Sequence, residues 1–407
     1  MQSQQIVVSG AGIAGLTAAI AFSDLGFRVR VYDRSPVLEE VGAGLQLSPN
    51  ATRILDRLGV LDIVRPSAVQ PEAVVLRDAA TLNERARVPL GAAADQRWKA
   101  PYLVAHRADL QNALLRRARE SALIEITLGA TVIDAEVQPD GVAVSVEQAG
   151  FTSEVEGMLF VAADGVWSNS RHLVGPDGKS RFTGELAWRT TISSDSDIGR
   201  HFVALCSPTV VTTFLHSGFH LVAYPVRAGA AINLVAFTPG VAIAEQWSGT
   251  TDAGALRHAM AGTAPELLRI VDEAAPWTVW PLHTADASHP WTRDGSIALI
   301  GDAAHAMTPF AAQGAAMAIE DAWTLANAVA AASDRPKALA EWEAVRKQRV
   351  ARVARRGALN HLAWHATGPV ALARNMFLKL KSPNSLAADL DWLYGWMPPG
   401  WTDEERL

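Results

Sequence analysis

The stretch VVSGAGIAGLTAA, residues 7–19, decides the fold. Its first residues read as a buried strand, and its last residues read as an apolar helix. Between them, Gly10, Gly12 and Gly15 stand in G-x-G-x-x-G spacing. In such a turn the first glycine permits the tight bend, the second lets the backbone approach a pyrophosphate, and the third lets helix and strand pack closely. Since the N-terminus of the helix faces the phosphates, the stretch predicts a dinucleotide site.

The end of the next strand supports this prediction. Residues 28–32 read as a Val-rich strand, which ends in Asp33 and Arg34. A carboxylate about 20 residues after the first glycine accepts hydrogen bonds from the adenosine ribose. The motif alone leaves open whether FAD or NAD occupies the site.

Composition limits the class of protein. The chain has 407 residues, 49% of them hydrophobic, and a formal charge of −6. This mild acidity argues against a nucleic-acid-binding protein, because basic surfaces supply most of that affinity. Cys206 is the only cysteine, which excludes an intrachain disulfide and fits a reducing compartment. The apolar start lacks the basic region of a signal peptide, and no window predicts a membrane span. We therefore expect a cytoplasmic protein with neither nucleic-acid nor membrane partners.

The periodicity predicts an α/β fold. Residues 5–33 read as β-α-β, residues 49–64 and 106–121 as helices, and residues 182–237 as alternating strands with turns at Ser217-Gly218 and Ala228-Gly229. After residue 336 the chain reads as helical. We predict a Rossmann-like nucleotide-binding domain, an inserted and mostly antiparallel sheet domain for the substrate, and C-terminal helices. The predicted boundaries are 1–70, 100–181 and 285–335 for the first, 71–99 and 182–284 for the second, and 336–407 for the third.

Two further strand ends carry an Asp-Gly or Gly-Asp pair. FVAADGVWSNSR places Asp164 after a buried strand, and IALIGDAAHAMTPFAAQGAAMAIEDA, residues 297–322, places Gly301 and Asp302 after another. Such a pair is often only a turn and a helix cap. The glycine fingerprint elsewhere in the chain favours a role in cofactor binding over this alternative. His305 reads as a structural or phosphate-side residue rather than a base.

Four motifs follow one another along the chain: the glycine fingerprint, HRADL at residues 106–110, the Asp164 turn and GDAAHAMTPFAAQGA. With them, the chain resembles the single-component flavoprotein aromatic hydroxylases, which include p-hydroxybenzoate and salicylate hydroxylase, over essentially its whole length. The resemblance implies FAD, tightly but non-covalently bound. The residues that it places on the cofactor are Gly10, Gly12, Gly15, Asp33, Arg34, Arg107, Asp164, Gly301, Asp302, Pro309, Gly314 and Ala315.

The resemblance also implies individual roles. Asp302 would hydrogen-bond the ribityl chain, Arg107 would reach the flavin's linker, and Asp164 would lie near the pyrophosphate and assist use of the nicotinamide nucleotide. Residues 309–314 would border the isoalloxazine ring, and the following helix would aim its positive end at the pyrimidine edge. Asp33 stands where the family more often has Glu, and we expect binding to survive the shorter side chain.

The substrate site is expected on the sheet domain, in HSGFHLVAYPVRAG, residues 216–229. His220 and Tyr224 are four residues apart in an alternating strand, so their side chains share one face. Here the chain resembles salicylate, 3-hydroxybenzoate and 6-hydroxynicotinate hydroxylases, in which a His-x-x-x-Tyr pair precedes Pro. The resemblance makes His220 the catalytic base and Tyr224 the residue that positions the substrate. An ordinary half-buried strand histidine is the alternative.

Three more residues are expected near the substrate. Gln46, in GAGLQLSPNA at residues 42–51, and Pro309 follow from the resemblance. Arg189 is a candidate for binding a substrate carboxylate, although an arginine on a sheet is more often a surface residue. The basic run of residues 345–357 reads as a solvated helix face.

The resemblance implies an enzyme, an FAD-dependent monooxygenase that hydroxylates a small phenolic or hydroxypyridine carboxylic acid through a flavin C4a-hydroperoxide. The co-substrates would be O2 and NADH or NADPH; the chain shows no second fingerprint, so the nicotinamide nucleotide would bind transiently. Attack at a carboxylate-bearing carbon would release carbon dioxide. We expect a monomer or homodimer. We also expect no metal, because no close His pair with a nearby carboxylate is recognised. Two alternatives stay open: a monooxygenase or epoxidase for a larger polycyclic substrate, and a flavin-binding redox sensor without turnover.

Overall fold

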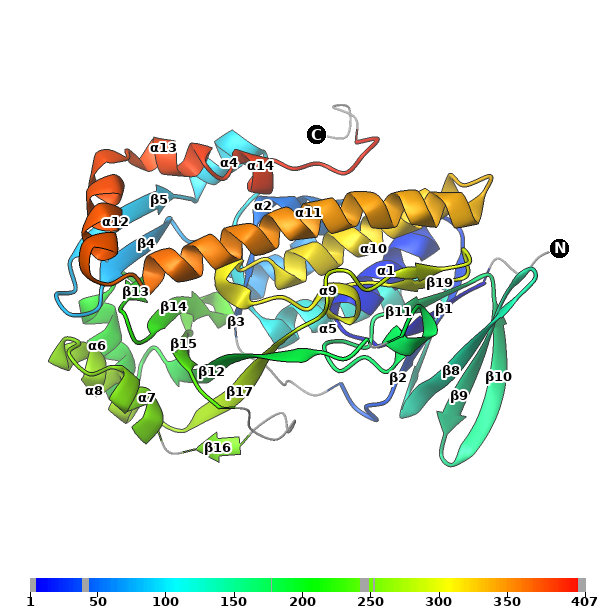
Figure 1. The fold of residues 1–407 in the computed structure, drawn as a ribbon, viewed down its shortest axis with the longest axis horizontal. Helices are drawn as coiled ribbons and strands as arrows, with labels where there is room; N and C mark the ends of the chain where they lie inside the picture. The colour runs from blue at the N-terminus through cyan, green and yellow to red at the C-terminus, as the bar shows by residue number, and fades with distance from the viewer. Residues whose placement is uncertain (1–4, 39–43, 177, 242–248, 252, 402–407) are drawn as a thin grey trace.

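The computed structural model describes residues 5–38, 44–176, 178–241, 249–251 and 253–401 of the chain. One half of the molecule is built on a six-stranded sheet in the order β18-β19-β11-β1-β2-β7 (Figure 1). Its strands are parallel except the edge strand β18. The strands are β1 (Gln5–Ser9), β2 (Arg28–Asp33), β7 (Ile124–Leu128), β11 (Leu159–Ala162), β18 (Thr292–Arg293) and β19 (Ile297–Leu299).

A small meander departs from the expected pattern. The alternation of residues 153–162 in the sequence indicates one antiparallel strand, but these residues divide between two elements. β10 (Phe151–Gly157) pairs antiparallel with β9 (Gly141–Gln148), which pairs with β8 (Ala130–Gln138). β11 instead lies parallel to β1 in the centre of the six-stranded sheet, because all four of its residues are buried on both faces.

The second half is an eight-stranded sheet in the order β16-β17-β12-β15-β14-β13-β4-β5, in which neighbouring strands are antiparallel apart from β13 and β4. Its strands are β4 (Ala73–Asp78), β5 (Glu84–Pro89), β12 (Arg181–Ser193), β13 (Val210–Leu215), β14 (His220–Val226), β15 (Ala231–Pro239), β16 (Gly249–Thr251) and β17 (Trp277–Thr284). The two predicted turns lie between β13 and β14 and between β14 and β15. The alternation missed helix α6 (Asp197–Leu205), which begins at the Ser196 cap.

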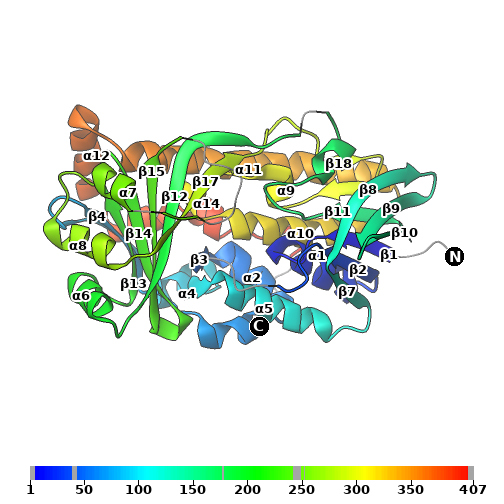
Figure 2. The ribbon, with the colours of Figure 1, turned by 90° about the horizontal axis from the view of Figure 1, so that it is seen from below.

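The two faces of this sheet pack against different partners. The outer face carries α6, α7 (Gly254–Ala259) and α8 (Pro265–Glu273), which lie on the side away from the six-stranded sheet (Figure 2). Leu221 and Ala223 belong to the apolar core on that side. Val222 and Tyr224 belong instead to the core that includes the six-stranded sheet. Alternate residues of β14 therefore point toward the nucleotide-binding half, which is the period that the sequence indicates.

Helices complete both halves. Helix α11 runs along the long axis of the molecule from one half to the other (Figures 1 and 2). The predicted helix over residues 49–64 is interrupted at Gly59, whose φ is +70°. The remaining pair of strands is β3 (Gly44–Leu47) with β6 (Leu103–His106). The helices not yet bounded are α1 (Ile13–Asp24), α2 (Pro49–Arg57), α3 (Leu61–Val64), α4 (Ala92–Trp98), α5 (Arg107–Arg119), α9 (Asp302–His305), α10 (Gly314–Ala330), α11 (Arg335–Trp364), α12 (Gly368–Leu380), α13 (Pro383–Ala388) and α14 (Asp391–Tyr394).

The prediction of an α/β fold is confirmed, whereas the exact domain boundaries stay a prediction. One expectation about α11 is wrong. The basic run of residues 345–357 is not simply a solvated face, because Arg346 and Arg349 are buried and pair with the equally buried Glu320. Among the described residues, none of the helices has an apolar stretch of the length and composition that a membrane crossing needs.

Candidate active site

The glycine turn between β1 and α1 is packed tightly at two of its glycines and open at the third. Gly10 has φ +100°, and a Cβ there would lie 2.5 Å from the Ala163 carbonyl oxygen. A Cβ on Gly15 would lie 1.9 Å from the Gly10 oxygen, so helix and strand approach as the motif requires. A Cβ on Gly12 would meet no described atom within 4 Å. The turn therefore offers bare backbone and open space at Gly12, which fits a pyrophosphate.

Asp33 holds the turn itself. Its Oδ2 accepts the backbone N–H of Ala11 at 2.6 Å, and its Oδ1 accepts that of Ser35 at 2.9 Å. Each carboxylate oxygen can still accept a second hydrogen bond. The predicted ribose contact stays a prediction, and the neighbouring Arg34 side chain is exposed.

The open space at Gly12 allows a selective test. We expect Gly12→Ala to weaken FAD binding about 10- to 100-fold, since an added methyl in a filled site costs about 1–3 kcal/mol. The apoprotein should keep its thermal stability, because the methyl meets no described atom. Fluorescence titration of apoprotein with FAD, beside a melting curve, checks both. Equal affinity in variant and wild type would mean that the cofactor does not approach Gly12.

Arg171 joins the two other strand ends that the sequence singled out. Its buried guanidinium donates to the carbonyl oxygens of Val166 at 2.8 Å, Asp302 at 2.6 Å and Ala303 at 2.7 Å. The turn after β11 is thereby fixed against the turn after β19. These carboxyl ends of parallel strands lie at the same edge as the glycine turn, where ligands of open α/β sheets bind.

The two aspartates of these turns differ. Asp164 Oδ2 accepts hydrogen bonds from the N–H groups of Asn169 and Ser170 and from the Ser170 hydroxyl. Its Oδ1 is buried and has no hydrogen-bond partner in the described part of the chain, so an acceptor is available to a ligand. The Asp302 side chain is exposed at the start of α9. Gly301 holds its turn with φ +59° and donates its N–H to Asp321 at 3.0 Å.

The first residues of α10 border space that is not filled by described atoms. Pro309, in the 3₁₀ helix Pro309–Ala311, and the first residues Gly314 and Ala315 are half-buried. A Cβ on Gly314 would meet no described atom within 4 Å. The first N–H groups of a helix lack intrahelical acceptors, so this terminus can receive the electron-rich edge of a flavin. His305 is buried against Asp321, with 2.5 Å between its Nε2 and Oδ2, in the position of a structural residue.

Several residues predicted for the substrate converge on the inner face of the eight-stranded sheet. A Cβ on Gly44 would lie 2.5 Å from Tyr224 Cε2, so β3 lies directly against this tyrosine. From the same strand, Gln46 Oε1 accepts the Tyr102 hydroxyl at 2.6 Å. Burial raises the pKa of Tyr224, while Arg189 opposes this. Tyr224 is therefore a neutral donor at pH 7.

Arg189 is not the surface residue that its place on a sheet suggests. It is half-buried, its guanidinium stacks on Trp280 with 5.3 Å to the ring centroid, and its Nε has no hydrogen-bond partner within the described ranges. The pKa of Arg189 is lowered to about 10 by burial and by the nearby Arg107, against an opposing effect of Tyr224. Arg189 stays charged at pH 7, and a substrate carboxylate would relieve its lack of partners. Arg107 itself is exposed at the first position of α5.

His220 is enclosed by aromatic rings. Its ring stacks on Phe237 at 4.6 Å and 19°, and it meets Phe310 and Trp364 at 5.3 and 4.8 Å. Its Nδ1 lies 2.9 Å from His365 Nε2, and its own Nε2 is buried without a partner in the described structure. Burial lowers the pKa of His220 well below 6.5, and the nearby His365 lowers it further. His220 is therefore neutral at pH 7, as a base must be before it acts.

Sequence reasoning missed the residues behind His220. Donor atoms of Glu185, His361 and His365 lie within 4.8 Å of one another, so the expectation of no His pair beside a carboxylate is wrong. The i, i+4 spacing in HLAWH was the available signal, since it places both rings on one side of a helix. Glu185 could not be foreseen because β12 lies far from α11 in the sequence. His361 Nε2 and Glu185 Oε1 contact each other at 2.5 Å, so these two groups are engaged with each other.

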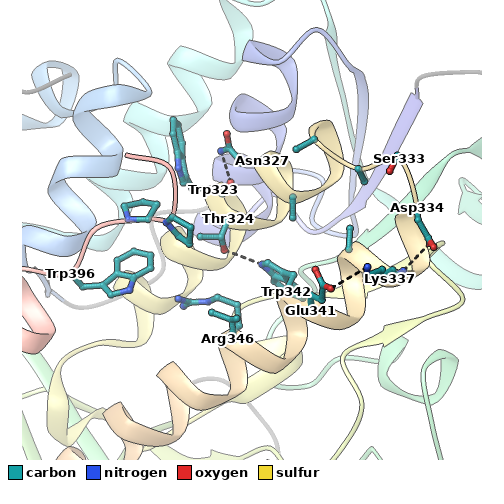
Figure 3. A pocket seen from close by; sticks show the side chains of 17 residues that line it. Trp323, Thr324, Asn327, Ser333, Asp334, Lys337, Glu341, Trp342, Arg346 and Trp396 are labelled. Atoms are coloured by element: carbon teal, nitrogen blue, oxygen red, sulfur yellow. Dashed lines mark hydrogen bonds and ion pairs between the residues drawn. The ribbon is translucent and has the colours of Figure 1, made fainter. Parts of the chain in front are cut away.

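A separate groove of about 630 Å³ lies between α10, α11 and the C-terminal segment. Figure 3 shows Trp323, Trp342 and Trp396 around it, with the Trp342 indole N–H directed at the Thr324 hydroxyl. None of the residues predicted for cofactor or substrate lines this groove. The candidate active site is the edge of the six-stranded sheet together with the inner face of the eight-stranded sheet.

The fold and this site define a dinucleotide-binding oxidoreductase with an aromatic-lined substrate face. A family model described as "FAD binding domain" matches residues 3–357. The chain therefore belongs to this family of FAD-binding proteins, and it is a flavoprotein monooxygenase, as the resemblance predicted.

Individual relatives agree. The chain is 34% identical to 3-hydroxybenzoate 6-hydroxylase 1 of Aquipseudomonas alcaligenes over 394 residues, 96% of this chain and 97% of the relative. It is 32% identical to 6-hydroxynicotinate 3-monooxygenase of Bordetella bronchiseptica, over 86% of this chain and 90% of the relative. Among solved structures, Klebsiella pneumoniae HpxO complexed with FAD and uric acid superposes with a TM-score of 0.80 at 25% identity, over 95% of each chain.

Proposed function

We propose that the protein hydroxylates a small phenolic or hydroxypyridine carboxylic acid, using O2 and transiently bound NADH or NADPH, with FAD held tightly but non-covalently. The observation that carries the proposal is the buried, partnerless Nε2 of His220, on the sheet face that also presents Tyr224. The acids named in the two relatives, 3-hydroxybenzoate and 6-hydroxynicotinate, combine a carboxylate with a ring hydroxyl. The proposal includes a cytoplasmic protein that is a monomer or homodimer.

The arrangement of the strand ends supports the proposed cofactor roles. A continuous edge of the sheet would hold the nucleotide and ribityl parts of FAD. It consists of the glycine turn with Asp33, the free Oδ1 of Asp164 and the exposed Asp302. The start of α10 would receive the ring. FAD, when bound, supplies the activation of O2 and the transfer of one oxygen atom to the substrate, which the protein cannot perform by itself.

The protein's own residues would prepare the substrate. Arg189 binds the carboxylate, and Tyr224 donates its hydroxyl to orient the ring. The phenolic O–H bond then breaks and its proton moves to His220 Nε2, which leaves an electron-rich phenolate ready for oxygen transfer. Phe237 and Phe310 keep water from the reacting ring. Carbon dioxide would leave only where oxygen is added at a carboxylate-bearing carbon.

Arg189 provides a test of how the acid is recognised. We expect Arg189→Gln to raise KM for the carboxylate substrate about 10- to 100-fold, because a hydrogen bond to a charged group contributes about 1.5–3 kcal/mol. The KM for the matching carboxamide should change little, since the amide does not form an ion pair with Arg189 in the wild type. Steady-state kinetics with acid and amide measure the difference. Equal losses for both would assign Arg189 a structural role.

A substrate panel tests the function as a whole. Hydroxybenzoates and hydroxypyridine carboxylates are scored for stimulated NADH and NADPH oxidation, for ¹⁸O from ¹⁸O2 in the product, and for released carbon dioxide. At least one small acid should stimulate oxidation and acquire one labelled oxygen. If none does, a larger polycyclic substrate is favoured. If bound flavin is not reduced by either nucleotide with any effector, the redox-sensor alternative replaces the proposal.

A further inference from the structure

A row of four side chains leads from the proposed base toward the surface. His220 Nδ1 lies 2.9 Å from His365 Nε2, at the end of α11. One turn earlier, the ring of His361 meets the ring of His365 at 4.3 Å, and His361 Nε2 lies 2.5 Å from Glu185 Oε1. His220 is fully buried, whereas the side chains of Glu185 and His361 are 14% and 32% exposed. The row therefore connects the closed substrate face with solvent.

The contact between His220 and His365 constrains the proton that they share. Two imidazole nitrogens 2.9 Å apart need one proton between them, so either His220 Nδ1 or His365 Nε2 is the donor. When His220 donates, its Nε2 carries a lone pair and can accept the substrate's proton. When His365 donates, His220 Nε2 carries a proton and can donate to the phenolate. Both tautomers of His220 are useful, one before and one after proton transfer, and His365 is the partner that can satisfy either.

The buried position of His220 explains why the proton that it accepts must be transferred to another group. The cationic form of His220 is disfavoured by its buried setting and by the neighbouring His365 and His361, all reflected in its low pKa. Burial, together with the neighbouring His361 and His216, also lowers the pKa of His365 to about 4. A proton accepted by His220 is thus poorly held both at this buried ring and at the half-buried ring of His365. Glu185 is a carboxylate at the outer end of this row that can attract the proton outward.

We propose that His365 is a positioning residue that sets the tautomer of His220, and that His365, His361 and Glu185 conduct the substrate's phenolic proton to solvent. As a proton reaches His220 Nε2, the Nδ1 proton passes to His365 Nε2, and a proton leaves His365 Nδ1. One ring nitrogen of His365 lies within 4.8 Å of donor atoms of Glu185 and His361, so the proton reaches this pair directly or through one water. Each N–H bond that breaks is replaced by one that forms, and one proton enters solvent. This inference rests on the proposed function.

The test follows the ionisation of a bound ligand rather than turnover. The probe is 3-hydroxy-4-nitrobenzoate, whose phenolate is coloured, mixed with FAD-loaded protein. Difference absorbance gives the pH at which half of the bound probe is ionised, and a pH indicator in stopped flow gives the rate of proton release. His365→Phe removes the hydrogen-bond partner of His220 Nδ1. When the bound probe is ionised and its proton lies on His220 Nε2, His220 Nδ1 is then buried and unsatisfied. We expect half-ionisation to move up by at least about one pH unit, a tenfold loss of ionisation.

Two further variants separate tautomer control from conduction. His365→Gln can accept or donate at the same place, so it should restore part of the pH shift. Glu185→Gln leaves the His220–His365 contact in place, so it should keep the half-ionisation pH and slow proton release about tenfold or more. His258→Gln, an exposed histidine on α7, is the control for losing one imidazole and should match wild type. Retained flavin absorbance shows that each variant is folded.

The outcomes distinguish the inference from the function beneath it. If wild type neither binds nor ionises the probe or any acid of the panel, the proposed function fails. If wild type ionises the probe and His365→Phe does so at the same pH and rate, the function stands and the role of His365 is wrong. An unchanged release rate in Glu185→Gln would remove Glu185 from the path.

Discussion

His220→Ala should retain FAD and lose about 10²- to 10⁴-fold in the rate of hydroxylation, which is the range that a positioned general base contributes. The loss has a structural reason. His220 is fully buried and its Nε2 has no partner among the described residues, so no described side chain stands beside it to accept the proton in its place. Product formation and the flavin spectrum are measured on the same sample. An unchanged rate of product formation would remove His220 from the mechanism.

The pH profile gives a second view of the same residue. Because burial holds the pKa of His220 well below 6.5, its lone pair persists into mildly acidic solution. Activity that depends on neutral His220 should therefore stay level down to about pH 6.5 and fall only below it, as the ring becomes protonated. An acidic limb centred above pH 6.5 would point to another group. Tyr224→Phe serves as the comparison, since it removes a hydroxyl from the same strand face without changing the base.

Local patterns predicted the parts of the site that depend on local geometry. Gly10, Gly12 and Gly15 form the expected turn because strand, turn and helix are adjacent in the chain. His220 and Tyr224 share a face because a strand alternates with period two. Such features depend only on spacing, and spacing is visible in a sequence.

Features that depend on tertiary packing were missed or misjudged. Glu185 lies beside His361 because a strand and a helix meet across the molecule, which no local pattern records. Arg346 looked like one charge in a solvated basic run, yet it is 1% exposed. Its partners Glu320 and Asp321 lie on α10, and they could not be recognised before α10 and α11 were packed together.

Arg346→Met is the variant for which we expect the largest loss of stability. The Arg346 guanidinium donates to Asp321 Oδ1 at 2.8 Å and to Glu320 Oε2 at 2.7 Å, and all three side chains are buried. Removing it leaves buried negative charge insufficiently compensated, a change that costs about 3–5 kcal/mol. Denaturant unfolding at pH 7 measures the difference in midpoint. Arg355→Met, an exposed arginine on the same helix, is the matched control and should unfold like wild type.

The pH dependence of this loss identifies its cause. Burial alone would raise the pKa of Asp321, but His305 and Arg346 lower it to about 2. A depressed carboxylate pKa stabilises the fold above the unfolded value near 4, and this contribution fades as the pH falls toward 2. The deficit of Arg346→Met should therefore shrink between about pH 4 and pH 2. Asp321 also accepts the Gly301 N–H at 3.0 Å, so the affinity of Arg346→Met for FAD should fall together with its stability. If the variant unfolds at a lower denaturant concentration but binds FAD as wild type does, the ion network does not support the cofactor turn.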